Sequence, residues 1–277
     1  MGYGVWGMGL NVVGTGRDLS LHRLIFNYLI INKMKKIVIL ILSALILMGF
    51  NQPDANEILD KVDKNMSSKN RVFESEMIIH GRRTSRTITS VSYSVGDKQS
   101  FTEYLSPARD QGTKMLKLEN QLWIYSPSTD RIIQISGHML RQSVMGSDLS
   151  YEDMMDDRKL NEVYTAKVTG TETIEGRNTY VVGLTAKVDD AAYYSMKIWV
   201  DAERYVPLKQ EMFARSGQLL KRTTLSNIKQ VQGRWFPMNM VYKDVLKEGS
   251  GTEFKFTSVK FDQNIPDYIF TKAALKK

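Results

Sequence analysis

Residues 111–157 read QGTKMLKLENQLWIYSPSTDRIIQISGHMLRQSVMGSDLSYEDMMDD. The first half predicts a β-meander, because turn-forming residues separate three strand-like runs, Lys114–Leu118, Gln121–Tyr125 and Arg131–Ile135. From Gly137 the sequence becomes a loop rich in Met, Ser and Gly, which ends in an acidic, amphipathic turn at Tyr151–Asp157. The loop therefore either carries chemistry or covers another part of the molecule.

Strand-like periodicity continues on both sides of this stretch. Three runs precede it, at Val72–His80, Arg86–Tyr93 and Lys98–Leu105. Longer runs follow it, at Tyr164–Glu175, Arg177–Ala186, Tyr193–Val200, Val206–Ala214, Leu219–Val231, Arg234–Asp244 and Thr252–Phe261. Most junctions contain glycine or other turn formers, and no helical pattern separates the strands. The sequence therefore predicts a mostly β fold with one antiparallel sheet, curled or closed, rather than βαβ units.

Two short helices are expected at the ends of this strand-rich region. Apolar residues follow helical spacing from Ala55 to Met66, with Asp54 as the N-cap and Glu57 as its capping-box partner. The segment from Ile265 to Leu275 looks like a short closing helix. We expect the first helix to pack one face on the sheet.

Large apolar residues recur at every second position of several strands, as in Met196-Lys197-Ile198 and Phe254-Lys255-Phe256. Each such strand has one apolar face, and two short helices cannot cover all of these faces. The sheet therefore either closes on a packed interior or wraps a cavity. The chain has fifteen methionines, which suit irregular apolar ligands, although methionine fills gaps in ordinary cores more often.

The N-terminal region has the pattern of an export signal. From Met34 the chain reads MKK and then the apolar run IVILILSALILMGF, followed by a polar stretch from Asn51. A short basic segment before such a run is typical of a secretory signal peptide, and a membrane anchor needs about 20 apolar residues. We therefore expect residues 34–55 to be a cleaved signal peptide rather than a retained anchor. Residues 1–33 are then explained by a start codon assigned too early, and residues 56–277 should form a single domain.

Charge and cysteine content narrow the function classes. After Ala55 the chain has 33 basic and 28 acidic residues, because the first 55 residues hold five of the 38 basic and two of the 30 acidic ones. This dilute basic excess makes nucleic acid an unexpected partner and leaves an anionic lipid surface open. The chain has no cysteine, which excludes disulfides, thiolate metal sites and a lipid-anchoring cysteine. An exported domain of this kind must be held by its core.

The sequence shows no catalytic signature. His80 and His138 are too isolated to suggest a metal site or an acid–base pair. The acids of the loop lack the glycine-centred spacing of a calcium site; they are Asp148, Glu152, Asp153, Asp156 and Asp157. Acids at the start of a short helix, with Asp148 or Ser150 as its cap, explain the cluster more simply. We expect no cofactor and no metal.

Three segments together resemble the LolA-like outer membrane lipoprotein-sorting proteins: Gly112–Leu116, Leu122–Pro127 and Met145–Met154. The last of these, MGSDLSYEDM, is the most specific, and the resemblance extends from about Ala55 to Leu275. It implies a LolA/LolB-like incomplete antiparallel β-barrel, or half-barrel, with a few covering helices and an apolar cavity for acyl chains. It also implies a periplasmic location and, for this branch, a link with RND-type lipid exporters.

We therefore predict a monomeric periplasmic carrier of lipid or lipoprotein that buries acyl chains and is not an enzyme. The predicted cavity lining is Met77, Ile79, Met115, Leu116, Trp123, Tyr125, Ile198 and Trp199, and the predicted lid residues are Met139, Leu140, Met145 and Leu149. Adjacent positions of a regular strand cannot both point inward, so about half of the lining set should face elsewhere. Two alternatives stay open: an interaction subunit of an RND-type exporter with a packed interior, and a hydrolase that uses the acids of Asp148–Asp157.

Overall fold

The computed structural model describes residues 26–36, 53–81 and 84–277. The chain divides into two compact units, Met1–Gln52 and Pro53–Lys277. In the first unit, residues 26–36 form a helix. The apolar run of the predicted signal peptide and residues 1–25 of the predicted extension lie outside the described residues. None of the helices in the described ranges has the length and apolar character needed to cross a membrane.

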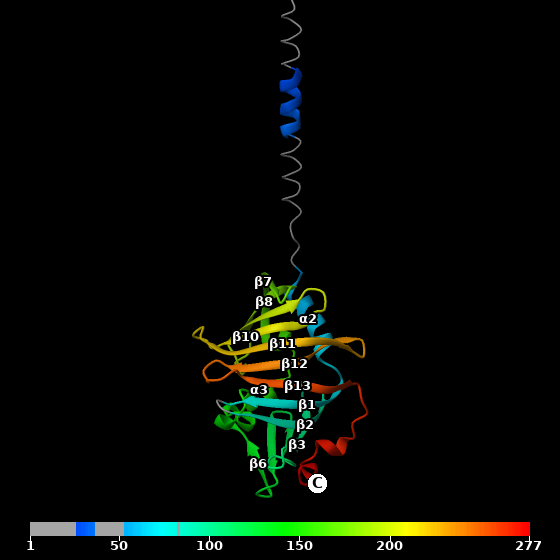
Figure 1. Ribbon diagram of the computed structural model, residues 1–277, viewed down its shortest axis with the longest axis vertical. Coiled ribbons are helices and arrows are strands. Elements are labelled where there is room, and N and C mark those ends of the chain that lie inside the picture. The colour runs from blue at the N-terminus through cyan, green and yellow to red at the C-terminus, as the bar shows by residue number, and fades with distance from the viewer. Residues whose placement is uncertain (1–25, 37–52, 82–83) are drawn as a thin grey trace, which may run out of the picture. The chain divides into compact units, whose positions relative to one another are not determined.

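The unit Pro53–Lys277 is built on one 13-stranded sheet (Figure 1). All neighbouring strands are antiparallel. The predicted mostly β, antiparallel fold with few helices is confirmed, and the sheet is open rather than closed into a barrel. The strands are β1 (Asn70–His80), β2 (Ser85–Val95), β3 (Gln99–Ser106), β4 (Lys114–Leu118), β5 (Gln121–Ser126), β6 (Arg131–Ile135), β7 (Tyr164–Ile174), β8 (Arg177–Ala186), β9 (Ser195–Asp201), β10 (Pro207–Phe213), β11 (Leu219–Val231), β12 (Arg234–Asp244) and β13 (Thr252–Phe261).

Two meanders make up this sheet. Strands β1 to β6 form one and β7 to β13 form the other, and they join where β1 pairs with β13 in the middle of the sheet (Figure 1). Strands β6 and β7 are consecutive in the chain yet lie at opposite edges of the sheet. Residues 136–163, hereafter the lid, must therefore pass from one edge to the other. Their apolar side chains pack on one face, hereafter the inner face.

Helix α2 (Ala55–Met66) packs on the same inner face, over the second meander. Its buried residues Ile58, Leu59 and Val62 contact a group of inward side chains on β8 and β9 that includes Leu184 and Ile198. Asp54 is the N-cap, as predicted, and accepts a hydrogen bond from the backbone N–H of Asn56. The predicted capping partner Glu57 instead pairs with Lys61 at 2.8 Å, because the two are one helical turn apart.

The C-terminal residues 262–277, hereafter the tail, cover part of the opposite, outer face. They contain the 3-10 helices η3 (Asp267–Phe270) and η4 (Lys272–Lys276), where the sequence predicted one short helix. Phe270 and Leu275 are buried against Phe101, Leu116 and Trp123 of β3, β4 and β5. Both faces of these strands are therefore buried, the outer by the tail and the inner by the lid.

The inner face carries three apolar clusters. One lies under α2, and another lies under the lid around Met77, Ile88 and Met115. Between them lies a group of aromatic rings, in which Phe73, Phe236 and Phe256 have centroid separations of 5.4 to 5.8 Å. The candidate functional site lies where the aromatic group meets the lid.

Candidate functional site

A cavity of about 310 Å³ lies between the inner face of the sheet and the lid. Its floor comes from strands β1, β2, β3, β12 and β13, and its roof includes Val144, Leu149 and Met154 of the lid. This volume is at the lower end of the range of about 300 to 1,000 Å³ found for small-molecule sites. The lining residues are Phe73, Ser75, Met77, Ser90, Ser92, Thr102, Tyr104, Val144, Leu149, Asp153, Met154, Met240, Tyr242, Phe254 and Phe256.

The cavity is associated with small side chains at inward positions of β1 and β2. Ser75, Ser90 and Ser92 line it, whereas larger residues fill the same face on either side. Ser75 Oγ lies 3.1 Å from Ser90 Oγ, and Ser92 Oγ lies 2.8 Å from Thr102 Oγ1. Because these hydroxyls bond to one another, they can face an apolar ligand without losing a partner.

The lid is a chain of short helical turns rather than one rigid element. It contains η1 (Gly137–Arg141), η2 (Val144–Gly146), α3 (Tyr151–Met155) and α4 (Leu160–Val163). Val144 is buried, and the apolar side chains around it are only partly buried; these are Met139, Leu140, Met145, Tyr151, Met154 and Met155. Flexible methionine side chains can repack around ligands of irregular shape.

Asp153 anchors α3 to the sheet from a side chain that is 2 % exposed. Ser150 caps the helix, and its N–H and hydroxyl donate to Asp153 Oδ2 at 2.8 and 2.7 Å. The hydroxyl of Tyr193 donates to Oδ1, and Lys221 Nζ lies 3.7 Å from Oδ2. Asp153 lines the cavity, yet both of its oxygens already have partners from the protein.

Tyrosine hydroxyls complete the environment of Asp153. Burial raises the pKa of Tyr193 and of Tyr242 well above the ordinary value, and the negative charge of Asp153 adds to the rise in each. Both phenols therefore stay protonated at neutral pH. Tyr193 can donate its hydrogen bond to the carboxylate over the whole physiological range.

Asp148 forms a second anchor, at the point where η2 leads into α3. Its Oδ2 accepts from the Thr252 hydroxyl at 3.0 Å, and its Oδ1 accepts from the backbone N–H of Asp244 at 3.0 Å. The backbone N–H of Asp148 donates to Thr252 Oγ1 at 2.9 Å, and Lys243 Nζ lies 3.7 Å from Oδ1. Asp148 therefore joins the lid to β12 and β13. Of the two residues predicted as the cap of α3, Asp148 and Ser150, the cap is Ser150.

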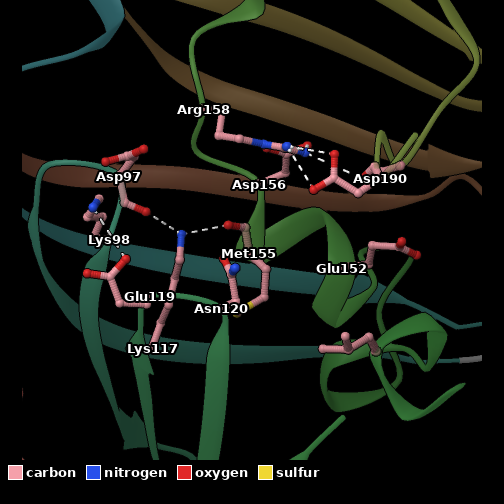
Figure 2. A pocket seen from close by; sticks show the side chains of 12 residues that line it. Asp97, Lys98, Lys117, Glu119, Asn120, Glu152, Met155, Asp156, Arg158 and Asp190 are labelled. Atoms are coloured by element: carbon pink, nitrogen blue, oxygen red, sulfur yellow. Dashed lines mark hydrogen bonds and ion pairs between the residues drawn. The ribbon is translucent and has the colours of Figure 1, made fainter. Parts of the chain in front are cut away.

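A separate polar pocket of about 340 Å³ lies at the far end of α3 (Figure 2). Lys117, which is 4 % exposed, donates there to the backbone carbonyls of Asp97 and Met155 at 2.6 Å each. Arg158 pairs with Asp156 at 2.8 Å and with Asp190 at 3.1 Å. Carboxylates outnumber cations in this lining, since it contains Asp97, Glu119, Glu152, Asp156 and Asp190 but only Lys98, Lys117 and Arg158.

The structure brings some of the predicted residues to the cavity or close to it. Met77 and Leu149 line it directly. Five others belong to the cluster between the sheet and the lid, namely Ile79, Met115, Met139, Leu140 and Met145. Ile198 is on the inner face but lies under α2, away from the cavity.

Four residues of the predicted lining lie on the outer face. Leu116, Trp123 and Tyr125 pack under the tail. Trp199 donates from Nε1 to Glu172 Oε2 at 2.7 Å, and the ammonium groups of Lys197 and Lys209 lie 4.5 and 4.1 Å from its ring centroid. Each of the four residues stands next to an inward-facing residue in its strand, and successive side chains of a strand point to opposite faces.

The residues predicted from the sequence do not include much of the lining of this cavity, for example Phe73, Tyr104 and Met240. One signal was present in the run Ser90-Val91-Ser92-Tyr93-Ser94, where serine alternates with larger residues. Such alternation indicates one face of small side chains and therefore room beside it. The other strands that border this space could not be read from the same pattern, because they are set by the long-range pairing of β1 with β13.

Comparisons with known proteins agree with this architecture. A protein-family model that is described only as that of an uncharacterized protein matches residues 96–277. A comparison with curated protein sequences gave no match.

Solved structures give a closer view of the fold. A domain from Vibrio parahaemolyticus named for outer membrane lipoprotein sorting is 24 % identical, with a TM-score of 0.69, over 81 % of this chain and 100 % of that one. A LolA superfamily protein from Nitrosomonas europaea is 24 % identical, with a TM-score of 0.68, over 80 % of this chain and 100 % of that one. A DUF1329 family protein from Desulfovibrio piger is 24 % identical, with a TM-score of 0.72, over 79 % of this chain and 96 % of that one. These likenesses show a shared LolA-type fold.

Proposed function

We propose that the protein is a carrier of acyl chains. The premise is that the chain belongs to the family whose model matches residues 96–277 and that it has the LolA-type fold. The cargo is a lipid or a lipoprotein, and carriage consists of reversible burial without a covalent step. The lid covers the bound chain in transit and moves aside for loading and release.

The observation that carries this proposal is the apolar cavity beneath a cover that is attached by buried carboxylates as well as by partly buried apolar side chains. Phe73, Phe254 and Phe256 give the cavity aromatic walls, while the serines beside them leave it hollow. Each methylene group buried there contributes about 0.8 kcal/mol, so affinity should rise about fourfold per methylene until the cavity is full. The volume of about 310 Å³ accommodates a limited length of chain, and longer chains require displacement of the lid.

The proposal includes location and partners. An exported, monomeric protein that acts in the periplasm agrees with the signal-like pattern from Met34. A carrier of this kind needs a donor and an acceptor for its cargo, and an inner-membrane exporter of the RND type is the partner that we propose for one of these steps.

The test is native mass spectrometry of the purified protein, with Ser90→Leu as the key variant. Ser90 is buried and lines the cavity, so a leucine should occupy the space that an acyl chain needs. We expect acyl-bearing molecules to copurify with the wild type and at least about tenfold less with Ser90→Leu, a loss of about 1.4 kcal/mol in binding.

The matched control is Thr87→Leu, on the exposed, outward side of the same strand β2. It should retain the wild-type amount of lipid, and thermal unfolding should show that both variants are folded. If the wild type carries no lipid and takes up no acyl chain when offered one, the carrier function is wrong and an interaction subunit becomes the better explanation.

A further inference from the structure

Three lysines, two on strands of the sheet and one in the turn after β12, contact the cavity side of the lid. Lys221 on β11 donates to the backbone carbonyl of Asp148 at 2.7 Å and lies 3.1 Å from Asp244 and 3.7 Å from Asp153. Lys243 on β12 lies 3.7 Å from Asp148 Oδ1. Lys247, in the turn after β12, donates to the backbone carbonyl of Ser147 at 2.8 Å and lies 4.0 Å from Asp244. These three residues are hereafter the lysine group.

In the closed state the lysine group faces three carboxylates within 4.0 Å in the described part of the chain. Two of them, Asp148 and Asp153, belong to the lid, and Asp244 belongs to the sheet. When the lid lifts, Asp148 and Asp153 leave with it and only Asp244 stays. The opened site is therefore cationic, and its ammonium groups lose buried partners that are costly to leave unreplaced.

The lysine group adjoins the cavity. Asp153 and Leu149 line the cavity, and they lie in the same short segment of the lid as Asp148. Asp153 thus connects the two, because it lines the cavity and its Oδ2 lies 3.7 Å from Lys221 Nζ. A chain seated in the cavity therefore places its head group beside these lysines.

The polar pocket at the other end of α3 has the opposite charge character. Its cations are outnumbered by carboxylates, and Lys117 and Arg158 are already engaged by Asp97, Met155, Asp156 and Asp190 (Figure 2). An anionic head group is repelled from that end. The charge distribution thus selects both the sign of the head group and the end at which it lies.

We propose that the cargo is an anionic amphiphile whose head group replaces Asp148 and Asp153 on the lysine group while its chain occupies the cavity. This inference rests on the carrier function proposed above and specifies its substrate class. Cargo and lid carboxylates compete for the same cations, so binding displaces the lid and release allows it to close again. The charge-assisted contacts that hold the lid are those that recognise the head group.

The test compares amphiphiles that share a twelve-carbon chain and differ in head group: dodecyl phosphate, dodecylphosphocholine, dodecyltrimethylammonium and dodecyl maltoside. Isothermal titration calorimetry on delipidated protein, below the micelle concentration of each, measures the affinities. We expect dodecyl phosphate to bind at least tenfold tighter than dodecyl maltoside, and its affinity to fall as salt increases because ions screen partly exposed charges. Inorganic phosphate alone should bind at least a hundredfold more weakly than dodecyl phosphate.

Two variants with opposite expected effects separate recognition from damage to the fold. Lys243→Gln/Lys247→Gln should reduce the ratio of the dodecyl phosphate affinity to the dodecyl maltoside affinity from at least tenfold to less than about threefold, whatever the loosened lid does to both. Asp148→Asn weakens the competing lid and should raise the affinity for dodecyl phosphate at least threefold. The matched control Lys197→Gln/Lys209→Gln makes the same charge change beside Trp199 on the outer face and should change neither affinity.

The outcomes distinguish the two proposals. If all four amphiphiles bind within about threefold of one another, the carrier function stands and the anionic specificity is overturned. If inorganic phosphate binds as tightly as dodecyl phosphate, the lysine group is an anion site unconnected with the cavity, which also overturns this inference. If no amphiphile binds, the carrier function itself fails.

Discussion

The lid and the tail both cover the sheet, but they are attached in different ways. The tail inserts Ile265, Phe270 and Leu275 into the outer core. Its ion pairs involve exposed carboxylates, Asp130 with Lys276 at 3.2 Å and Asp262 with Arg234 at 3.3 Å. The lid instead packs partly buried methionines on the inner face and is held through buried carboxylates. An apolar cover loses its contacts outright when it lifts, whereas the charged groups of a polar cover can exchange protein partners for water or a ligand. We therefore expect the tail to act as a permanent seal and the lid as a removable one.

The largest effect is expected from Leu275→Ala in the tail. Leu275 is 0 % exposed, and its truncation leaves a cavity that the surrounding strands cannot refill. The free energy of unfolding should fall by about 3 kcal/mol, measured by urea denaturation. The control Tyr268→Ala removes a large but exposed tail side chain and should change it by less than about 0.5 kcal/mol. Equal losses in both variants would contradict the description of the tail as a seal.

The next effect is expected from Asp153→Asn in the lid. The substitution removes the negative charge opposite Lys221 and disturbs the capping box with Ser150. Opening of the lid should become easier by about 1 to 3 kcal/mol, and global unfolding should change less because the lid can lift without the sheet. Tryptic cleavage after the exposed Arg141 measures this opening.

The matched control for Asp153→Asn is Asp130→Asn, which removes the exposed partner of Lys276 in the tail. It should leave cleavage after Arg141 unchanged. A loss of global stability in Asp153→Asn as large as in Leu275→Ala, without faster cleavage of the lid, would show that the two covers do not differ.

A smaller, pH-dependent effect is expected at Asp63, where α2 meets the end of the lid. Burial raises the pKa of Asp63 to about 6, with Lys159 opposing the rise. The folded state therefore holds this proton more tightly than the unfolded state, so stability is lost as pH rises from about 4 to about 6 and stays lower above that. Asp63→Asn mimics the protonated form and should stabilise the protein by about 1 kcal/mol at pH 7.5, a value reduced for the partial exposure of the side chain.

Thermal unfolding of Asp63→Asn and the wild type at pH 7.5 and pH 4 measures this effect. The stabilisation by Asp63→Asn should vanish at pH 4, because Asp63 is then protonated in the folded wild type. An equal gain at both pH values would mean that the substitution acts through packing instead of charge.

The smallest effect is expected from Lys98→Ala at the polar pocket. Lys98 pairs with Glu119 at 3.5 Å, and the two side chains are 64 % and 68 % exposed. Such a pair contributes less than about 0.5 kcal/mol, so urea denaturation should give nearly the wild-type value. A loss comparable to that of Asp153→Asn would show that burial is not what makes the lid contacts strong.

The order of the strands and the boundaries of several of them could be predicted from the sequence. The run predicted at Arg177–Ala186 has the bounds of β8, and those predicted at Leu219–Val231 and Arg234–Asp244 have the bounds of β11 and β12. These successes depend on a period of two and on local turn formers, which are properties of neighbouring residues. The capping role of Ser150 could be anticipated for the same reason.

The direction in which each strand faces could not be predicted in the same way. Met115 and Leu116 are adjacent and both buried, one under the lid and the other under the tail. A strand with two apolar faces carries no local mark of which face is inner. The assignment depends on the lid and the tail, which are distant in sequence.

Local pattern thus accounts for a cysteine-free β protein with a signal-like N-terminal pattern and a methionine-rich loop between two sets of strands, because periodicity and composition need no knowledge of distant contacts. The pairing of β1 with β13, the passage of the lid from one edge of the sheet to the other and the hollow beneath it arise from contacts between residues far apart in the chain. Asp148 and Asp153 became anchors only when folding placed Lys221, Lys243 and Thr252 opposite them. A carboxylate takes its role from the groups that surround it, and those groups are assembled by the fold.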